Sequence, residues 1–311
     1  MRARPLGSQG PSISVIGFGA WEAGGVGWGP PLPDDEVLRA MRAAFDAGIG
    51  WVDTAELYGG GRSEELVGKA VQDRDDVGVF TKVAPTGSGV HAAGVRKGAE
   101  GSLRRLRRDV IDLYQVHWPH PQVPLEETWE AMAELVEDEL VRFVGLSNFG
   151  RDQIERCEAI RHVDSLQPHF SMLHRAGRED LFPFCQANGT GVICYGPLAY
   201  GLLTGAVTAE TRFGPDDWRS GLLGVGYYAE LFAPGVLERN LEIVASLRPV
   251  ADRLGVTLAQ LALAWVVHQE GVTGAIAGSR SPRHVVDNAA AGDVELGPED
   301  LEEIEAALKR G

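Results

Sequence analysis

Short runs rich in β-branched and aromatic residues alternate with stretches of helical periodicity along this 311-residue chain. Eight such runs are each followed by a helical pattern. The runs are nearly continuous in apolar residues, which is typical of parallel strands buried on both faces. Eight strand-helix units close into a barrel more readily than they form an open sheet. The sequence therefore predicts an α/β fold, a (β/α)8 or TIM barrel. The expected strands are residues 13–21, 51–55, 77–83, 110–118, 141–147, 163–167, 191–195 and 272–277.

Two segments depart from this alternation. Residues 204–234, after the seventh strand, contain glycine, aromatic and charged residues and predict a long loop insertion over one rim. Residues 297–308 begin with Gly-Pro-Glu-Asp and predict an amphipathic C-terminal helix. We find no linker and no low-complexity tract, so we expect residues 1–311 to form a single domain. The other expected helices start at residues 34, 63, 91, 125, 151, 178, 236, 257 and 282.

The charge balance excludes several classes of partner. The chain has 29 basic and 44 acidic residues and a formal net charge of −15, so we expect no nucleic-acid or membrane surface. No run of about 18 apolar residues occurs, and no apolar run follows the basic residues near the first Met, so we expect neither an export signal nor a membrane span. Cys157, Cys185 and Cys194 are scattered, which indicates free thiols in a reducing compartment. We therefore expect a cytoplasmic protein.

Polar residues stand where three consecutive strands end. Asp53 and Tyr58 follow the second strand, Lys82 lies near the end of the third, and His117 lies at the end of the fourth. The carboxyl ends of barrel strands converge on one face, where active sites lie, so we expect these side chains to meet. Ser63, just beyond them, is expected to be the N-cap of the next helix.

These residue types suit proton transfer to an oxygen. Asp53 and Lys82 on adjacent strands can pair and leave a cation beside the hydroxyl of Tyr58, which we expect to lower the pKa of that phenol. His117 would bond the same oxygen or orient a carbonyl. Such a site protonates an oxygen on which charge develops, as hydride addition to a carbonyl requires. The alternative is structural: a buried Asp bonded to its own turn, a half-exposed Tyr, a Lys that reaches the rim and a core His.

Several stretches make the chain resemble the aldo-keto reductases, in that family's order and over nearly the whole length. These are residues 17–21 (GFGAW), 53–59 (DTAELYG), 80–82 (FTK), 112–119 (DLYQVHWP), 145–148 (GLSN), 195–198 (YGPL), 201–205 (GLLTG) and Asn288. The resemblance implies a (β/α)8 barrel, a nicotinamide cofactor held in extended form at the rim, and a catalytic tetrad of Asp53, Tyr58, Lys82 and His117.

The resemblance also implies cofactor contacts along the barrel rim. Ser147, Asn148 and Gln167 would face the carboxamide, and Tyr195 would stack on the nicotinamide. His284 stands where relatives often carry Gln. The remaining expected cofactor residues are Gly19, Ala20, Trp21 and Asp53 near the first two strand ends, Gly196, Pro197, Leu198, Gly201 and Leu203 after the seventh strand, and Gly278, Ser279, Arg280, His284 and Asn288 at the adenosine end.

Substrate contacts are expected from Trp21, Tyr58, His117 and Trp118, with the insertion containing Trp218, Tyr227 and Tyr228 completing the pocket. The expected partner is a small-molecule carbonyl compound. NADP rather than NAD is predicted because Arg280 and Ser279 precede a helix start at Pro282, where an anion is favoured.

The function predicted from the sequence is NADP(H)-dependent reduction of aldehydes or ketones, sugar carbonyls included, to alcohols. No metal is expected, because no further ligands are spaced around His117 and His120. Two alternatives stay open. Lys82 could form a Schiff base in a lyase, or the scaffold could be a non-catalytic sensor of the nicotinamide cofactor. The sequence predicts neither the substrate nor the oligomeric state.

Overall fold

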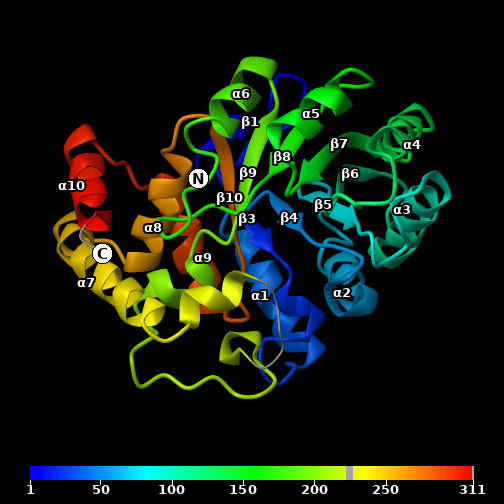
Figure 1. The fold of residues 1–311 in the computed structure, drawn as a ribbon. Helices are drawn as coiled ribbons and strands as arrows, with labels where there is room; N and C mark the ends of the chain where they lie inside the picture. The colour runs from blue at the N-terminus through cyan, green and yellow to red at the C-terminus, as the bar shows by residue number, and fades with distance from the viewer. Residues whose placement is uncertain (222–226, 310–311) are drawn as a thin grey trace.

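The computed structural model describes residues 1–221 and 227–309. Eight parallel strands form a closed barrel in the order β10-β3-β4-β5-β6-β7-β8-β9, and helices surround it (Figure 1). The predicted (β/α)8 barrel is confirmed. The barrel strands are β3 (Ile16–Gly19), β4 (Trp51–Asp53), β5 (Gly78–Val83), β6 (Ile111–Val116), β7 (Val141–Ser147), β8 (Ser165–Gln167), β9 (Gly191–Tyr195) and β10 (Val272–Ala277).

The first predicted strand, residues 13–21, is in fact divided. Strands β1 (Ala3–Pro5) and β2 (Ser12–Ser14) form an antiparallel hairpin outside the barrel, and β3 begins only at Ile16. Ser14 forms the corner: its Oγ donates to the carbonyl of Ile16 at 2.7 Å and accepts from the amide of Gly50 at 2.9 Å. The apolar run alone does not reveal this break, because the partner Gly50 is 36 residues away.

Large apolar side chains fill the amino-terminal half of the barrel interior. Trp51 and Phe80 stack there with ring centroids 4.9 Å apart, and Leu6 and Ile276 belong to the same cluster. Gly17 has to lack a side chain, because a Cβ at that position would lie 2.3 Å from the Trp51 ring. Since side chains alternate along a strand, the next inward position toward the carboxyl end is two residues further on. On β4 and β5 these positions are Asp53 and Lys82.

Ten α-helices pack around the barrel in the described part of the chain. The helix expected from residue 178 begins three residues later, after Asp180, whose carboxylate accepts from the amide of Leu181. The helices are α1 (Asp34–Asp46), α2 (Arg62–Ala70), α3 (Ala92–Leu106), α4 (Leu125–Glu137), α5 (Arg151–Glu158), α6 (Leu181–Asn188), α7 (Val236–Leu254), α8 (Leu258–Val267), α9 (Pro282–Ala290) and α10 (Pro298–Leu308). The last is the predicted C-terminal helix.

The insertion after β9 runs beside the loop that follows β3, along the lower side of Figure 1. Within its described residues it contains two short 3-10 turns, η4 (Trp218–Ser220) and η5 (Tyr227–Phe232). The amide of Trp218 donates to the carbonyl of Gly27 at 2.9 Å, and Trp28 forms a bridge with Asp217. The insertion is therefore joined to the loop after β3 at the rim of the barrel.

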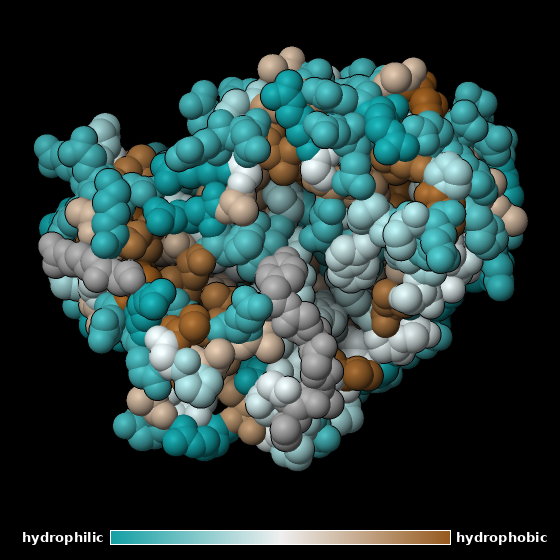
Figure 2. Space-filling model, in the orientation of Figure 1, coloured by the Kyte–Doolittle hydropathy of each residue, from teal (hydrophilic) through white to brown (hydrophobic). Residues whose placement is uncertain are grey.

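The face shown in Figure 2 is mostly hydrophilic, and its hydrophobic side chains lie in several small groups. Among the described residues, no single helix has the length and apolar character needed to cross a membrane; α7 and α8 meet that test only together, and they are bent by 89°. Cys157, Cys185 and Cys194 are buried and free, as predicted.

Candidate functional site

Asp53, Tyr58, Lys82 and His117, here called the tetrad, meet at the carboxyl end of the barrel. The Lys82 ammonium lies 2.5 Å from Oδ2 of Asp53 and also donates to the carbonyl of Thr54 at 2.8 Å. It donates to the hydroxyl oxygen of Tyr58 at 3.4 Å. The rings of Tyr58 and His117 are 5.7 Å apart. The Asp53–Lys82 pair predicted from adjacent strands is present, and the Tyr58 O–H remains able to donate elsewhere.

A glycine turn positions Tyr58. Tyr58 opens the 3-10 turn η2 (Tyr58–Gly61), in which Gly59 and Gly60 have φ of 63° and Gly61 has φ of 99°. A Cβ on Gly59 would lie 2.1 Å from the carbonyl oxygen of Gly24, in the turn η1 (Glu22–Gly24). Because L-residues avoid positive φ and the gap holds no side chain, this turn depends on glycine.

Ser63 is not the helix N-cap that the sequence suggested. Helix α2 begins at Arg62 with Gly61 in the cap position, and no side chain caps it. Ser63 lies inside the first turn, where its buried hydroxyl donates to the carbonyl of Ala20 at 2.7 Å and contacts the Thr54 hydroxyl at 2.8 Å. These bonds tie the start of α2 to the ends of β3 and β4, which carry the site.

Burial is the largest cause of the pKa shifts of Lys82, His117 and Tyr58. It lowers the pKa of Lys82, an effect that the Asp53 carboxylate opposes. Burial and the nearby Lys82 cation hold the pKa of His117 well below its usual value, so the imidazole is neutral near pH 7. A neutral imidazole carries one N–H donor and one acceptor nitrogen. His117 can therefore donate a hydrogen bond to an oxygen in the cleft without adding charge.

The expectation that Lys82 lowers the pKa of Tyr58 is wrong for this structure. Burial raises the pKa of the Tyr58 hydroxyl well above its usual value, and the Asp53 carboxylate and Tyr228 raise it further. The Lys82 ammonium was expected to favour the phenolate, but the Asp53 carboxylate beside it neutralises much of its electric field. Tyr58 is consequently protonated throughout the neutral range, so its hydroxyl carries a proton that it can donate.

The residues expected at the carboxamide lie together on the rim beside the tetrad. The Tyr195 hydroxyl donates to Oδ1 of Asn148 at 2.7 Å, and the Asn148 amide donates to the carbonyl of His117 at 3.0 Å. The Ser147 hydroxyl donates to the carbonyl of Gln167 at 3.0 Å. Tyr228, from the insertion, places its hydroxyl 2.7 Å from that of Tyr195. Four strand ends and the insertion are thus linked at one end of the cleft.

A cleft of about 960 Å³ extends from Tyr58 to the start of α9. Lys82 does not line it, because the ammonium is fully buried behind Tyr58. Leu203 does not line it either: the positive φ values of Tyr200 and Gly201 turn the chain so that Leu203 packs into the core. The other residues expected outside the insertion all line the cleft: Gly19, Ala20, Trp21, Asp53, Tyr58, His117, Trp118, Ser147, Asn148, Gln167, Tyr195, Gly196, Pro197, Leu198, Gly201, Gly278, Ser279, Arg280, His284 and Asn288.

Aromatic side chains form the wall opposite the strand ends. Trp21 lies 6.3 Å from the Tyr58 ring and packs edge-on against Trp28 at 5.0 Å. Trp118, 38% exposed, stacks on His117 at 3.7 Å. Trp218 is fully buried and stacks behind Trp21 at 6.0 Å, so it supports the wall without lining it. The side chain of Tyr227 lies outside what the structure describes.

Sequence reasoning missed two kinds of residue in the cleft. Trp28 and Tyr200 belong to the aromatic wall, but both lie in irregular segments that carry no periodic signal. Glu22 also lines the cleft and faces Arg280 across it. Its position directly after Trp21, at a strand end, was the signal that could have identified it.

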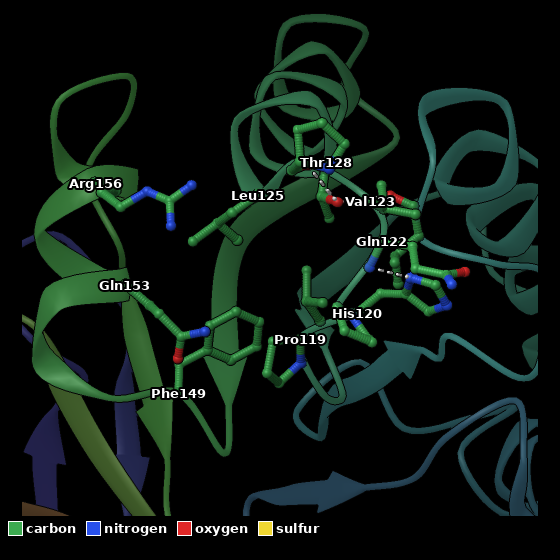
Figure 3. Close-up of a pocket in the computed structure, with 13 residues that line it drawn as sticks. Pro119, His120, Gln122, Val123, Leu125, Thr128, Phe149, Gln153 and Arg156 are labelled. Atoms are coloured by element: carbon green, nitrogen blue, oxygen red, sulfur yellow. Dashed lines mark hydrogen bonds between the residues drawn. The ribbon is translucent and has the colours of Figure 1, made fainter.

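Figure 3 shows a second cavity, of about 340 Å³, beside the N-terminus of α4. Leu125 and Phe149 contribute its apolar wall, and Gln153 and Arg156 of α5 lie at its edge. The Arg156 guanidinium is bound to the carboxylate of Glu126, and none of the described residues that line the cavity belongs to the tetrad. Within residues 1–221 and 227–309, no three His, Cys, Asp or Glu side chains form a group that could hold a metal ion.

Comparison with known proteins gives one consistent result. The model of the "Aldo/keto reductase family" matches residues 15–309. An aldo-keto reductase of Bacillus subtilis is 34% identical, over 99% of this chain and 94% of its own. A probable voltage-gated potassium channel subunit beta of Oryza sativa is 32% identical, over 99% of this chain and 97% of its own.

Two solved structures carry the comparison further. The glycerol dehydrogenase from Gluconobacter oxydans has a TM-score of 0.87 and 30% identity, and the match covers 99% of this chain and 95% of that one. An aldo/keto reductase from Klebsiella pneumoniae, solved in complex with NADP and acetate, has a TM-score of 0.74 and 31% identity, covering 97% of this chain and 95% of that one. The resemblance noted in the sequence is therefore confirmed.

Proposed function

Because this chain belongs to the aldo/keto reductase family, we propose that it is an NADP(H)-dependent oxidoreductase that reduces aldehydes or ketones, sugar carbonyls among them, to alcohols. The observation that carries the proposal is the buried Lys82–Asp53 pair whose ammonium donates to the Tyr58 hydroxyl at 3.4 Å. We propose further that residues 1–311 act as one domain, because the cleft takes residues from both ends of the chain, from Gly19 to Asn288.

The residues of the cleft fit a nicotinamide dinucleotide. Backbone packs against backbone at Gly278: a Cβ there would lie 2.5 Å from the carbonyl oxygen of Gly19, so no side chain projects from this part of the cleft wall. Just beyond it, α9 starts at Pro282 with Arg280 and Arg283 nearby, and a helix start with cations favours phosphate. Ser147, Asn148 and Gln167 would hold the carboxamide. When bound, the cofactor supplies the hydride.

Tyr58 would supply the proton. As charge develops on the carbonyl oxygen, the Tyr58 O–H donates its proton to that oxygen, and the neutral His117 donates a hydrogen bond to the same atom. The Lys82 ammonium already points at the Tyr58 oxygen, so the phenolate left behind is stabilised without any rearrangement. Asp53 holds that ammonium in place, because its Oδ2 accepts a hydrogen bond from it.

The aromatic wall would receive the rest of the substrate. Trp21, Trp118 and Tyr228 line the cleft around Tyr58, so neutral carbonyl compounds with flat or apolar groups fit this end. No substrate follows from this alone, because loops such as the insertion vary independently of the barrel.

A Schiff-base lyase fits the geometry poorly. The Lys82 amine would have to reach a substrate carbonyl, but it is fully buried, is bonded to Asp53 and Thr54, and does not line the cleft. A cofactor sensor is the second candidate, favoured by the similarity to plant channel subunits. Against a purely non-catalytic role, all four members of the tetrad are present and in contact.

The test is a panel of aldehydes, ketones and sugars with NADPH, followed at the nicotinamide absorbance. We expect turnover with at least one class. Tight NADPH binding in a fluorescence titration, with no turnover on any class, would favour the sensor instead. Borohydride trapping of a substrate on Lys82 would favour the lyase and contradict the reductase.

A further inference from the structure

A buried polar layer crosses the barrel interior next to the apolar cluster of Trp51 and Phe80. Its members are Asp53 of β4, Lys82 of β5, Gln115 of β6 and Gln167 of β8, and none is more than 3% exposed. Polar groups this deep are costly unless each is hydrogen-bonded, so the contacts within the layer determine where each side chain points. The layer contains two tetrad members and one residue expected at the carboxamide.

Gln115 joins the other members of this layer. One oxygen of Asp53 is taken by Lys82 at 2.5 Å, while the other accepts from Gln167 at 2.8 Å and from Gln115 at 3.4 Å. The amide nitrogen of Gln167 also donates to Oε1 of Gln115 at 3.2 Å. Both N–H groups of Gln167 are therefore used inside the layer, which leaves its carbonyl oxygen as the group that can face the cleft lined by Gln167.

The backbone leaves room for this contact. Gln115 pairs with Gly145 on β7, and Gly145 pairs with Ser165 on β8. A Cβ on Gly145 would lie 3.3 Å from Cγ of Gln115 and 2.2 Å from the hydroxyl of Ser165. Because Gly145 has no side chain, the Gln115 amide can extend across β7 to Gln167, which belongs to β8.

We propose that Gln115 is a positioning residue for the reaction proposed above. It does not line the cleft, so it acts through its neighbours. It fixes which face of the Gln167 amide is presented to the cofactor carboxamide, and it holds the second oxygen of Asp53, which in turn positions the Lys82 ammonium. Recognition of the nicotinamide and stabilisation of the Tyr58 phenolate therefore share one hydrogen-bond network. The inference rests on the proposed function.

The central test is Gln115→Leu, which keeps the approximate volume but removes both the donor to Asp53 and the acceptor of Gln167. The Gln167 amide can then turn over and present N–H groups to the cleft. We expect kcat to fall by about 10-fold and NADPH to bind several-fold more weakly, with the KM for the carbonyl substrate within about twofold. NADPH binding is measured by fluorescence titration, so it does not depend on turnover.

A second variant, Gln115→Glu, separates positioning from packing. When protonated, the introduced carboxyl can donate to Asp53 and accept from Gln167, as the amide does; when ionised, it faces the Asp53 carboxylate and can no longer donate. We expect its kcat to approach that of the parent at low pH and to fall as pH rises. This descending limb of the pH–rate profile should be absent from the parent. This variant also keeps the test available if Gln115→Leu does not fold.

Gln269→Leu is the matched control. Gln269 is also a buried amide, 6% exposed, and it donates to the carbonyl of Trp265 at 2.9 Å, away from the tetrad. We expect it to retain parental kcat whatever it costs in thermal stability. The proposal is overturned if Gln115→Leu keeps parental kcat and NADPH affinity, if its loss is no greater than that of Gln269→Leu at equal stability, or if Gln115→Glu shows no new pH limb. Absence of turnover in the parent would contradict the proposed function alone, because the NADPH titration would still measure the effect of Gln115→Leu on cofactor binding.

Discussion

The Nε atom of Arg280 lies 3.6 Å from Oε2 of Glu22, across the cleft that both residues line. Arg280 also donates to the carbonyl of Pro30 at 3.1 Å. The cation that the sequence assigned to the 2′-phosphate of NADP is therefore already engaged by the loop after β3. A phosphate bound near α9 would compete with Glu22 for this guanidinium.

Glu22→Gln is accordingly expected to tighten NADPH binding, by about 3- to 10-fold, because it removes both a competing carboxylate and its repulsion of the anionic cofactor. Burial raises the pKa of Glu22, although Arg280 opposes the rise. A raised carboxyl pKa means that Glu22 protonates at a higher pH than usual, so parental affinity should increase as pH falls through that pKa. Fluorescence titrations between about pH 5 and 8 should show the parent gaining NADPH affinity relative to Glu22→Gln as pH falls, a comparison that cancels the titration of the 2′-phosphate common to both. Weaker binding by Glu22→Gln would mean that the carboxylate supports the site.

Arg280→Ala should weaken NADPH binding by about 10- to 100-fold and barely affect NADH, since a charge-assisted bond to phosphate contributes roughly 1.5 to 3 kcal/mol. The difference should shrink at high salt, because the guanidinium is partly exposed. Arg104→Ala, the same charge change on an exposed face of α3, is the control. Equal weakening of both cofactors by Arg280→Ala would show that Arg280 does not read the phosphate.

Tyr58→Phe should lower kcat by about 10²-fold or more while NADPH affinity stays near the parental value, because it removes only the proton donor. The pKa of Tyr58 is raised well above its usual value by burial, so the hydroxyl is protonated at every pH in the neutral range. The loss in kcat should therefore be the same at about pH 6 and about pH 8. A Phe variant with near-parental kcat would remove Tyr58 from the proposed mechanism.

Lys82→Met should destabilise the protein by about 3 to 5 kcal/mol, because it leaves the Asp53 carboxylate buried without its cation. The double variant Lys82→Met with Asp53→Asn should be more stable than that single variant, since no uncompensated charge remains. Denaturant unfolding measures both. A double variant less stable than Lys82→Met would mean that the pair contributes through packing and not through charge.

Features that depend on the order of the strands could be predicted from the sequence. Features that depend on burial by residues far away in the sequence could not. The Asp53–Lys82 pair was predictable because β4 and β5 are neighbours and both residues lie on inward positions near the carboxyl ends. The direction of the Tyr58 pKa shift was not, because it is set mainly by desolvation and the local pattern does not reveal how deeply the hydroxyl lies. The role of Ser63 was missed for a related reason: its partner, the carbonyl of Ala20, is 43 residues away.

The rim loops were the least predictable part of the site. Trp28 and Glu22 follow β3 without periodicity, and this loop is held by distant segments: the amide of Trp218 in the insertion donates to the carbonyl of Gly27, and Arg280 after β10 donates to that of Pro30. Motifs placed most of the expected cofactor residues at strand ends that line the cleft, yet a motif records only residue identity. It could not indicate that Leu203 is turned into the core by the positive φ of Tyr200 and Gly201.

The last prediction separates backbone strain from close packing at the turn that carries Tyr58. Gly59 and Gly60 share a φ of 63°, so an alanine at either position costs a similar strain, of about 1 kcal/mol. Only Gly59 is packed: its Cβ would lie 2.1 Å from the Gly24 carbonyl oxygen, whereas a Cβ on Gly60 would have no neighbour within 4 Å. Gly59→Ala must therefore push η2 away from η1 and move Tyr58 from Lys82. We expect it to lose about 10-fold or more in kcat, while Gly60→Ala loses stability alone. Equal kcat in the two variants would show that the contact between η1 and η2 does not set the position of Tyr58.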